Sequence, residues 1–89
     1  MTSRTTRRFR SSLRVLPVEV QQQAAEAYEL FLDNPRHPSL QFKQLHTTEP
    51  VYSVRISRNY RALGVLEGPD ILWFWIGAHG EYEKLLRSL

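Results

Sequence analysis

Residues 51–78 of the chain read VYSVRISRNYRALGVLEGPDILWFWIGA, and this stretch decides the fold. It is rich in β-branched and aromatic residues, which is typical of strands. Two short breaks with turn-forming residues divide it, at 57–59 and 68–70. The pattern predicts an antiparallel meander of three strands, over residues 51–56, 60–67 and 71–78.

The length of the breaks also predicts how these strands pair. If each break closes a hairpin, Arg55 faces Arg61, Arg61 faces Gly77, Leu63 faces Trp75 and Glu67 faces Ile71. Because side chains alternate across a sheet, one face is then apolar and suits a cover of helices. The residues expected on that face are Tyr52, Val54, Ile56, Tyr60, Ala62, Gly64, Leu66, Leu72, Phe74, Ile76 and Ala78. The face expected to stay uncovered carries Ser53, Arg55, Arg61, Leu63, Val65, Trp73, Trp75 and Gly77.

Helical patterns lie before the meander and after it. Apolar residues recur at helical spacing within residues 17–33, and Asn34-Pro35 ends that segment, since a residue before proline is pushed out of the helical region. Shorter helices are expected over 9–16 and 81–89, and an edge strand over 3–7. The sequence thus predicts an α+β fold in one domain over residues 1–89. Its antiparallel sheet would have about four strands, with two N-terminal helices on one face and a short C-terminal helix.

The composition excludes several classes of protein. The 89 residues include no cysteine, so disulfides and thiolate chemistry are excluded. The histidines His37, His46 and His79 have no ligand spacing, and we expect neither a metal nor another cofactor. No apolar run approaches the roughly 20 residues of a membrane helix, and the N-terminus does not read as a secretory signal. These features favour a cytoplasmic protein that does not act at a membrane.

Charge is distributed unevenly along the chain. Residues 1–16 contain five arginines and no acid, residues 17–34 contain four acids and no base, and residues 35–61 contain five bases against Glu49 alone. Segregation of this kind suggests an anionic partner on one side of the fold. An unevenly charged, solvated surface is the alternative.

The paired arginines are the best candidates for a binding site. Two arginines opposite one another on a sheet repel, and a bound anion would satisfy both. Gly77 beside Arg61 would leave space for a ligand, and His79 and Tyr82 follow directly. Arginine can stabilise a charged phosphorane, histidine can exchange protons near neutral pH, and tyrosine can stack on a base. RNA cleavage needs such groups.

Each of these residues also has a purely structural interpretation. Arg55 can pair with Glu49 or Glu67, and Arg61 can likewise be structural. His79 can bond to the backbone at the end of a strand, and Tyr82 can pack in the core. Trp73 and Trp75 are interpreted as core residues more readily than as base-stacking platforms. Lys43 and Arg58 are interpreted as solvated cations that touch backbone phosphates.

The order of these motifs resembles the RelE/ParE toxin superfamily over residues 3–86. The features that carry the resemblance are Tyr60-Arg61 after a basic strand and the strand ending Gly77-x-His79-x-x-Tyr82. The resemblance implies a toxin of a type II toxin–antitoxin pair. RelE-like members cleave mRNA in the ribosomal A site without metal and leave a cyclic phosphate.

Carried over by position, the resemblance implies that Arg55 and Arg61 bind the scissile phosphate. It implies that His79 is a general acid and that Tyr82 stacks on or activates the nucleotide. The sequence differs from the family at two positions, because Ser53 and Ala78 stand where a cation is common. The site therefore carries less positive charge than in such relatives. Glu81 is an alternative candidate for the general base.

Three functions follow as hypotheses. The first is an mRNA endonuclease that acts on the ribosome and is neutralised by an antitoxin, which would cover or displace the terminal helix with Leu85, Leu86 and Leu89. The second is a ParE-like protein that poisons DNA gyrase by binding. The third is a non-catalytic module that binds nucleic acid or antitoxin.

Overall fold

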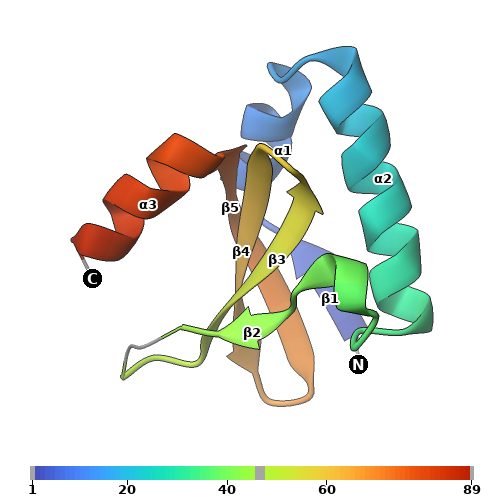
Figure 1. Ribbon diagram of the computed structural model, residues 1–89. Coiled ribbons are helices and arrows are strands. Elements are labelled where there is room, and N and C mark those ends of the chain that lie inside the picture. The colour runs from blue at the N-terminus through green and yellow to red at the C-terminus, as the bar shows by residue number, and fades with distance from the viewer. Residues whose placement is uncertain (1, 46–47, 89) are drawn as a thin grey trace.

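Nine elements follow one another along the chain in the computed structural model, which describes residues 2–45 and 48–88 (Figure 1). They are β1 (Thr2–Thr5), α1 (Arg7–Arg14), α2 (Val18–Asp33), the 3-10 turn η1 (Pro38–Leu40), β2 (Lys43–Gln44), β3 (Val51–Ser57), β4 (Tyr60–Glu67), β5 (Asp70–Ala78) and α3 (His79–Arg87). The predicted α+β class and the three-stranded meander are confirmed.

The sheet differs from the prediction in strand number and in direction at one edge. It has five strands in the order β1-β5-β4-β3-β2. The unpredicted strand is β2, a two-residue edge that pairs with β3. β1 runs parallel to β5, so the expectation of a wholly antiparallel sheet is wrong. Parallel neighbours need a long crossover connection, which α1, α2 and the meander provide between β1 and β5.

The helices α1 and α2 form a hairpin that covers one face of the sheet, here called the first face. α1 begins two residues earlier than predicted because the Thr6 side chain caps it, accepting a hydrogen bond from the Phe9 N–H (3.0 Å). α2 buries the predicted stripe of Val20, Ala24, Ala27 and Phe31, of which the last three pack in the core against the sheet, and it ends before Pro35. Among the described residues, no helix is long and apolar enough to cross a membrane.

A β-bulge in β5 overturns part of the predicted register. Leu63 pairs with Trp75 as expected, but the next residue, Gly64, pairs with Trp73, so Phe74 is the extra residue. Beyond the bulge the two faces are exchanged. Trp73 therefore lies in the core of the first face, whereas Leu72 and Phe74 do not lie there as predicted. Glu67 consequently faces Asp70 rather than Ile71.

The bulge requires a glycine at position 64. A Cβ at this position would lie 2.7 Å from Trp73 Cε3 and 2.9 Å from Ile71 Cγ1. Both neighbours are buried, at 4% and 0% exposure, so neither can move aside easily. Gly64→Ala is expected to lower the free energy of unfolding by about 1–3 kcal/mol, measured by urea denaturation.

Gly80→Ala is the matched control for that substitution. A Cβ at Gly80 in α3 meets nothing within 4 Å, and alanine is the better helix former. This variant should be as stable as the wild type, or more stable by up to about 1 kcal/mol. Equal stability of the Gly64→Ala and Gly80→Ala proteins would show that the bulge does not depend on the missing Cβ.

The opposite face of the sheet, here called the second face, is also covered. α3 packs on it, so that α2 and α3 lie on opposite sides of the sheet (Figure 1). Leu45, Leu63 and Tyr82 form the buried centre of this layer, with Phe74, Trp75, Val51, Leu85 and Leu86 around them. The expectation that this face stays uncovered is wrong over its aromatic half. Its basic half lies beside the beginning of α3.

Candidate functional site

The two arginines lie opposite one another, as predicted. Arg55 pairs with Arg61 across β3 and β4, and Arg61 pairs with Gly77 across β4 and β5. Cross-strand partners project from the same face of a sheet. The strand register therefore directs both side chains toward the second face, but Arg55, near the sheet edge, also lines a pocket of about 250 Å³ with Gln23 and Glu26 of α2.

Arg61 is half-buried and only partly satisfied. One terminal nitrogen donates a hydrogen bond to Gln41 Oε1 (3.0 Å), and the guanidinium carbon lies 5.6 Å from the centre of the Tyr82 ring. Its Nε and its other terminal nitrogen are buried and have no hydrogen-bond partner among the described residues. Burying donors without acceptors is costly. An anion that brings oxygen acceptors would satisfy these N–H groups once the side chains that bury them move aside.

His79 directly follows β5 and is the first residue of α3. Its backbone N–H donates to the carbonyl oxygen of Asn59 (2.7 Å), which fixes the helix start against the β3–β4 turn. Its Nε2 lies 2.9 Å from Glu83 Oε1, and its Nδ1 is buried without a partner in the described part of the chain. The bond to the backbone is thus made by the main-chain N–H of His79, whereas the imidazole contacts the Glu83 carboxylate.

Tyr82 joins the arginine and the histidine. Its ring contacts the Arg61 guanidinium on one side, and its centre lies 5.9 Å from that of the His79 ring. It is 4% exposed and belongs to the buried layer under α3, as its structural interpretation predicts. The structure therefore brings three of the predicted site residues, Arg61, His79 and Tyr82, into one cluster.

Gly77 does not leave the space that the sequence suggested. A Cβ at this position would lie 2.7 Å from Trp75 Cζ2, because the indole of Trp75 lies over it. The expectation of a ligand gap beside Arg61 is therefore wrong. The glycine serves to pack Trp75 against the strand.

The remaining predicted residues surround the cluster. Arg55 has no hydrogen bond or ion pair among the described residues, and Glu67, one of its expected partners, pairs with Arg4 instead (3.2 Å). Lys43 is exposed on the edge strand β2, and Arg58 is exposed in the turn that contacts α3 through Asn59. Lys43 and Arg58 are thus accessible to a polyanion, whereas Arg55 is half-buried.

Three residues of the site were not predicted. Gln41 accepts a hydrogen bond from Arg61. Its backbone is left-handed (φ 46°) directly after η1, and the sequence did not predict this conformation. Ser53 was noted only as a missing cation, yet it is fully buried, and its Oγ has no partner in residues 2–45 and 48–88. Glu83 follows His79 by four residues, so helical spacing could have revealed the pair.

The buried hydroxyl of Ser53 leads to a test of stability. Because its Oγ has no partner among the described residues, Ser53→Ala is expected to keep the free energy of unfolding or raise it by up to about 1 kcal/mol. Ser3→Ala is the matched control, since Ser3 Oγ accepts the Trp73 indole N–H (2.9 Å), and it should cost about 1–2 kcal/mol. Urea denaturation distinguishes the two. A loss at Ser53 as large as that at Ser3 would contradict the unpartnered hydroxyl.

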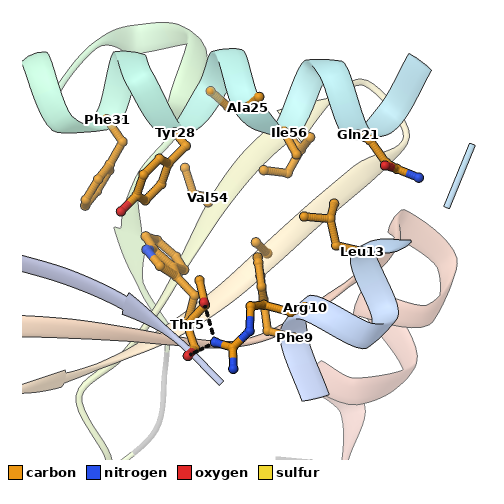
Figure 2. Close-up of a pocket in the computed structure, with 14 residues that line it drawn as sticks. Thr5, Phe9, Arg10, Leu13, Gln21, Ala25, Tyr28, Phe31, Val54 and Ile56 are labelled. Atoms are coloured by element: carbon orange, nitrogen blue, oxygen red, sulfur yellow. Dashed lines mark hydrogen bonds between the residues drawn. The ribbon is translucent and has the colours of Figure 1, made fainter. Parts of the chain in front are cut away.

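A separate apolar cleft lies on the first face, between the helix hairpin and the sheet (Figure 2). It measures about 360 Å³ and is lined by residues such as Phe9, Leu13, Tyr28 and Phe31. Arg10 at its rim donates to the carbonyl oxygen (2.7 Å) and the hydroxyl (2.9 Å) of Thr5. The cleft is on the other side of the sheet from Arg61. Within the described residues, no three His, Asp or Glu side chains could together hold a metal ion.

Known structures share this arrangement of elements. A chain of the RelB–RelE antitoxin–toxin complex from Methanococcus jannaschii superposes with a TM-score of 0.73 at 15% identity, covering 91% of this chain and 95% of that one. YafQ from E. coli gives 0.72 at 8% identity, covering 90% and 94%. The isolated E. coli RelE toxin gives 0.66 at 18% identity, covering 99% and 98%. At these identities the likeness shows the fold alone.

The sequence itself carries the family assignment. No curated protein matches it significantly. A model of the ParE-like toxin domain, however, matches residues 18–84, which include both arginines, His79 and Tyr82. Since this match spans most of the sequence and the fold agrees with it, the chain belongs to the ParE-like toxins, within the RelE/ParE superfamily of type II toxin–antitoxin systems.

Proposed function

We propose that this toxin is a ribosome-dependent mRNA endonuclease that works without metal or other cofactor and blocks translation. The observation that carries the proposal is the half-buried Arg61, whose Nε and terminal nitrogen have no partner among the described residues. Arginine presents its donors in a planar fork that matches the oxygens of a phosphate. A scissile phosphate would supply the missing acceptors.

Each residue of the cluster has a part in this proposal. Arg61 holds the phosphate and stabilises the charge that develops on it, an electrostatic contribution that is often the largest in catalysis. Gln41 accepts a hydrogen bond from one terminal nitrogen and so orients the guanidinium, while the two other nitrogens bind the phosphate. His79 exchanges a proton with the reacting ribose or the leaving group. Tyr82, buried in the free chain, stacks on the nucleotide after α3 moves.

Three further cations extend the site along the RNA. Arg55, Lys43 and Arg58 lie on β3, on the edge strand β2 and in the β3–β4 turn, and contact backbone phosphates in this proposal. Such contacts supply affinity but no sequence readout. Because Ser53 and Ala78 are neutral, few charges share the reacting phosphate, and catalysis depends heavily on Arg61.

A cognate antitoxin is the proposed protein partner. The similar structures include antitoxin–toxin complexes from M. jannaschii and E. coli. An acidic antitoxin segment would compete with RNA for the basic half of the second face. Leu85 and Leu86 of α3 pack on this face, so a partner that covers or displaces α3 would control the site. Leu89, also named from the sequence, lies outside the described residues.

A second candidate function is binding and poisoning of DNA gyrase, which the match to the ParE-like model favours. Induction of the chain in bacterial cells separates the two. The nuclease predicts growth arrest with new 5′ ends inside translated mRNA, mapped by primer extension, and no such ends on RNA without ribosomes. Growth arrest with double-strand DNA breaks and intact mRNA would support gyrase poisoning instead. Binding of antitoxin without toxicity would leave only a non-catalytic module.

A further inference from the structure

Glu83 holds His79 in a defined orientation. The two residues lie four positions apart on α3 and therefore on the same side of the helix. The His79 Nε2 to Glu83 Oε1 distance of 2.9 Å is that of a hydrogen bond. The proposed function above uses His79 but assigns nothing to Glu83.

This contact fixes which nitrogen of the imidazole carries the proton. A carboxylate only accepts hydrogen bonds, so the nitrogen that faces Glu83 must be the donor. A neutral imidazole has a single N–H, which is then at Nε2, and Nδ1 keeps a lone pair. If Nδ1 were protonated instead, its N–H would be buried without an acceptor among the described residues, at a desolvation cost.

The charged groups around His79 are compatible with this arrangement. Arg61 from β4 lies over the Tyr82 ring, whose centre is 5.9 Å from that of the imidazole. On α3 itself, Glu81 and Lys84 pair with each other at 3.8 Å, and both are exposed. Lys84 thus forms its ion pair with Glu81, and the carboxylate of Glu83 is available to His79. The β3–β4 turn contributes only a backbone carbonyl, from Asn59, to the His79 backbone N–H.

We propose that Glu83 is a positioning residue that makes His79 Nδ1 the general base of RNA cleavage; this inference rests on the proposed nuclease function. Nδ1 takes the proton of the ribose 2′-hydroxyl, and the O2′ electron pair forms the new bond to phosphorus. The P–O5′ bond breaks, its electron pair stays on O5′, and O5′ takes a proton from water. The hydroxide left by that water then takes the proton back from Nδ1, which restores the neutral imidazole. The products are a cyclic phosphate and a 5′-hydroxyl. Nε2–H stays bonded to Glu83 throughout.

The tautomer can be measured on the free, full-length chain. In ¹⁵N NMR at a pH where imidazole is neutral, His79 of the wild type should show a protonated Nε2 and an unprotonated Nδ1. His37 is an internal reference, because its Nδ1 accepts the Ser39 N–H (3.2 Å) and must also be unprotonated. Loss of signals in His79→Gln assigns the resonances.

Glu83→Gln tests the cause, and Glu81→Gln is the matched control on the same helix. Glu83→Gln replaces the carboxylate by an amide whose N–H₂ can also donate to the imidazole, and the His79 signals should shift toward a mixture of tautomers. His37 should not change, and Glu81→Gln should change neither histidine. A His79 protonated at Nδ1 in the wild type, or unchanged in Glu83→Gln, would overturn the inference.

Activity supplies a second readout. Glu83→Gln should cut ribosome-bound mRNA about ten- to a hundredfold more slowly, within the contribution of a positioned base, at unchanged RNA affinity. If the wild type cuts no RNA, the proposed function fails, whatever the tautomer. If the wild type cuts RNA and Glu83→Gln cuts equally fast, the positioning role alone is overturned.

Discussion

Replacing Arg61 by alanine is expected to slow mRNA cleavage on the ribosome by about 10²–10³-fold, as loss of a group that stabilises transition-state charge commonly does. The guanidinium is the half-buried cation of the cluster, and two of its nitrogens are unpartnered among the described residues. Truncation removes these donors together with the positive charge against the Tyr82 ring. The rate is measured by primer extension in a translation extract that is programmed with one mRNA.

Two further variants show whether the loss is specific. Arg61→Lys keeps the charge but not the planar fork, so it should recover only part of the rate. Arg58→Ala removes an exposed cation from the neighbouring turn and should weaken RNA binding slightly, while the cleavage rate at saturation stays within about threefold of wild type. Cleavage by Arg61→Ala as fast as by Arg58→Ala would refute the role of Arg61. Thermal unfolding of each variant separates loss of chemistry from loss of fold.

Hydrophobic patterning predicted the meander and the long helix, because both elements form by burying an apolar face. A one-residue slip in the hairpin of β3 and β4 would turn its arginines toward the helices, so the pairing of Arg55 with Arg61 follows from the sequence. The bulge at Phe74 could not be found in this way. Residues 71–76 are apolar without interruption, so alternation carries no information about which face each one occupies.

The sequence predicted the site residues whose positions depend on strand register. It missed those whose positions depend on a loop conformation or on where a helix begins. Arg61 followed from the register and Tyr82 from its distance along the chain. Gln41 reaches Arg61 only because the backbone turns left-handed after η1, which the amino-acid type does not indicate. Glu83 was missed because the last helix was predicted to begin only at residue 81, which left His79 between the strand over 71–78 and that helix. Since His79 begins a helix, the residue four positions later contacts it.

Phe31→Ala is expected to lower the free energy of unfolding by about 3–5 kcal/mol, a large part of the roughly 4–13 kcal/mol typical of a chain of this length. Phe31 is 2% exposed, and its ring packs edge-on against Trp73 (5.3 Å between centroids) and Phe42 (5.1 Å). Such aromatic pairs contribute about 0.5–1.5 kcal/mol beyond area burial. Urea denaturation followed by tryptophan fluorescence measures the change.

Leu32→Ala is the matched control for Phe31→Ala, because the neighbouring side chain is 54% exposed and should cost less than about 1 kcal/mol. Similar losses in the two variants would contradict the assigned core. The Phe31 substitution should also affect the Arg61 site. Phe42 follows Gln41 directly, so its contact with Phe31 joins α2 to the segment that holds Arg61. At low denaturant, where Phe31→Ala is still folded, the Gln41–Arg61 hydrogen bond should therefore weaken in this variant and persist in Leu32→Ala, as measured by exchange of the Arg61 side-chain N–H groups.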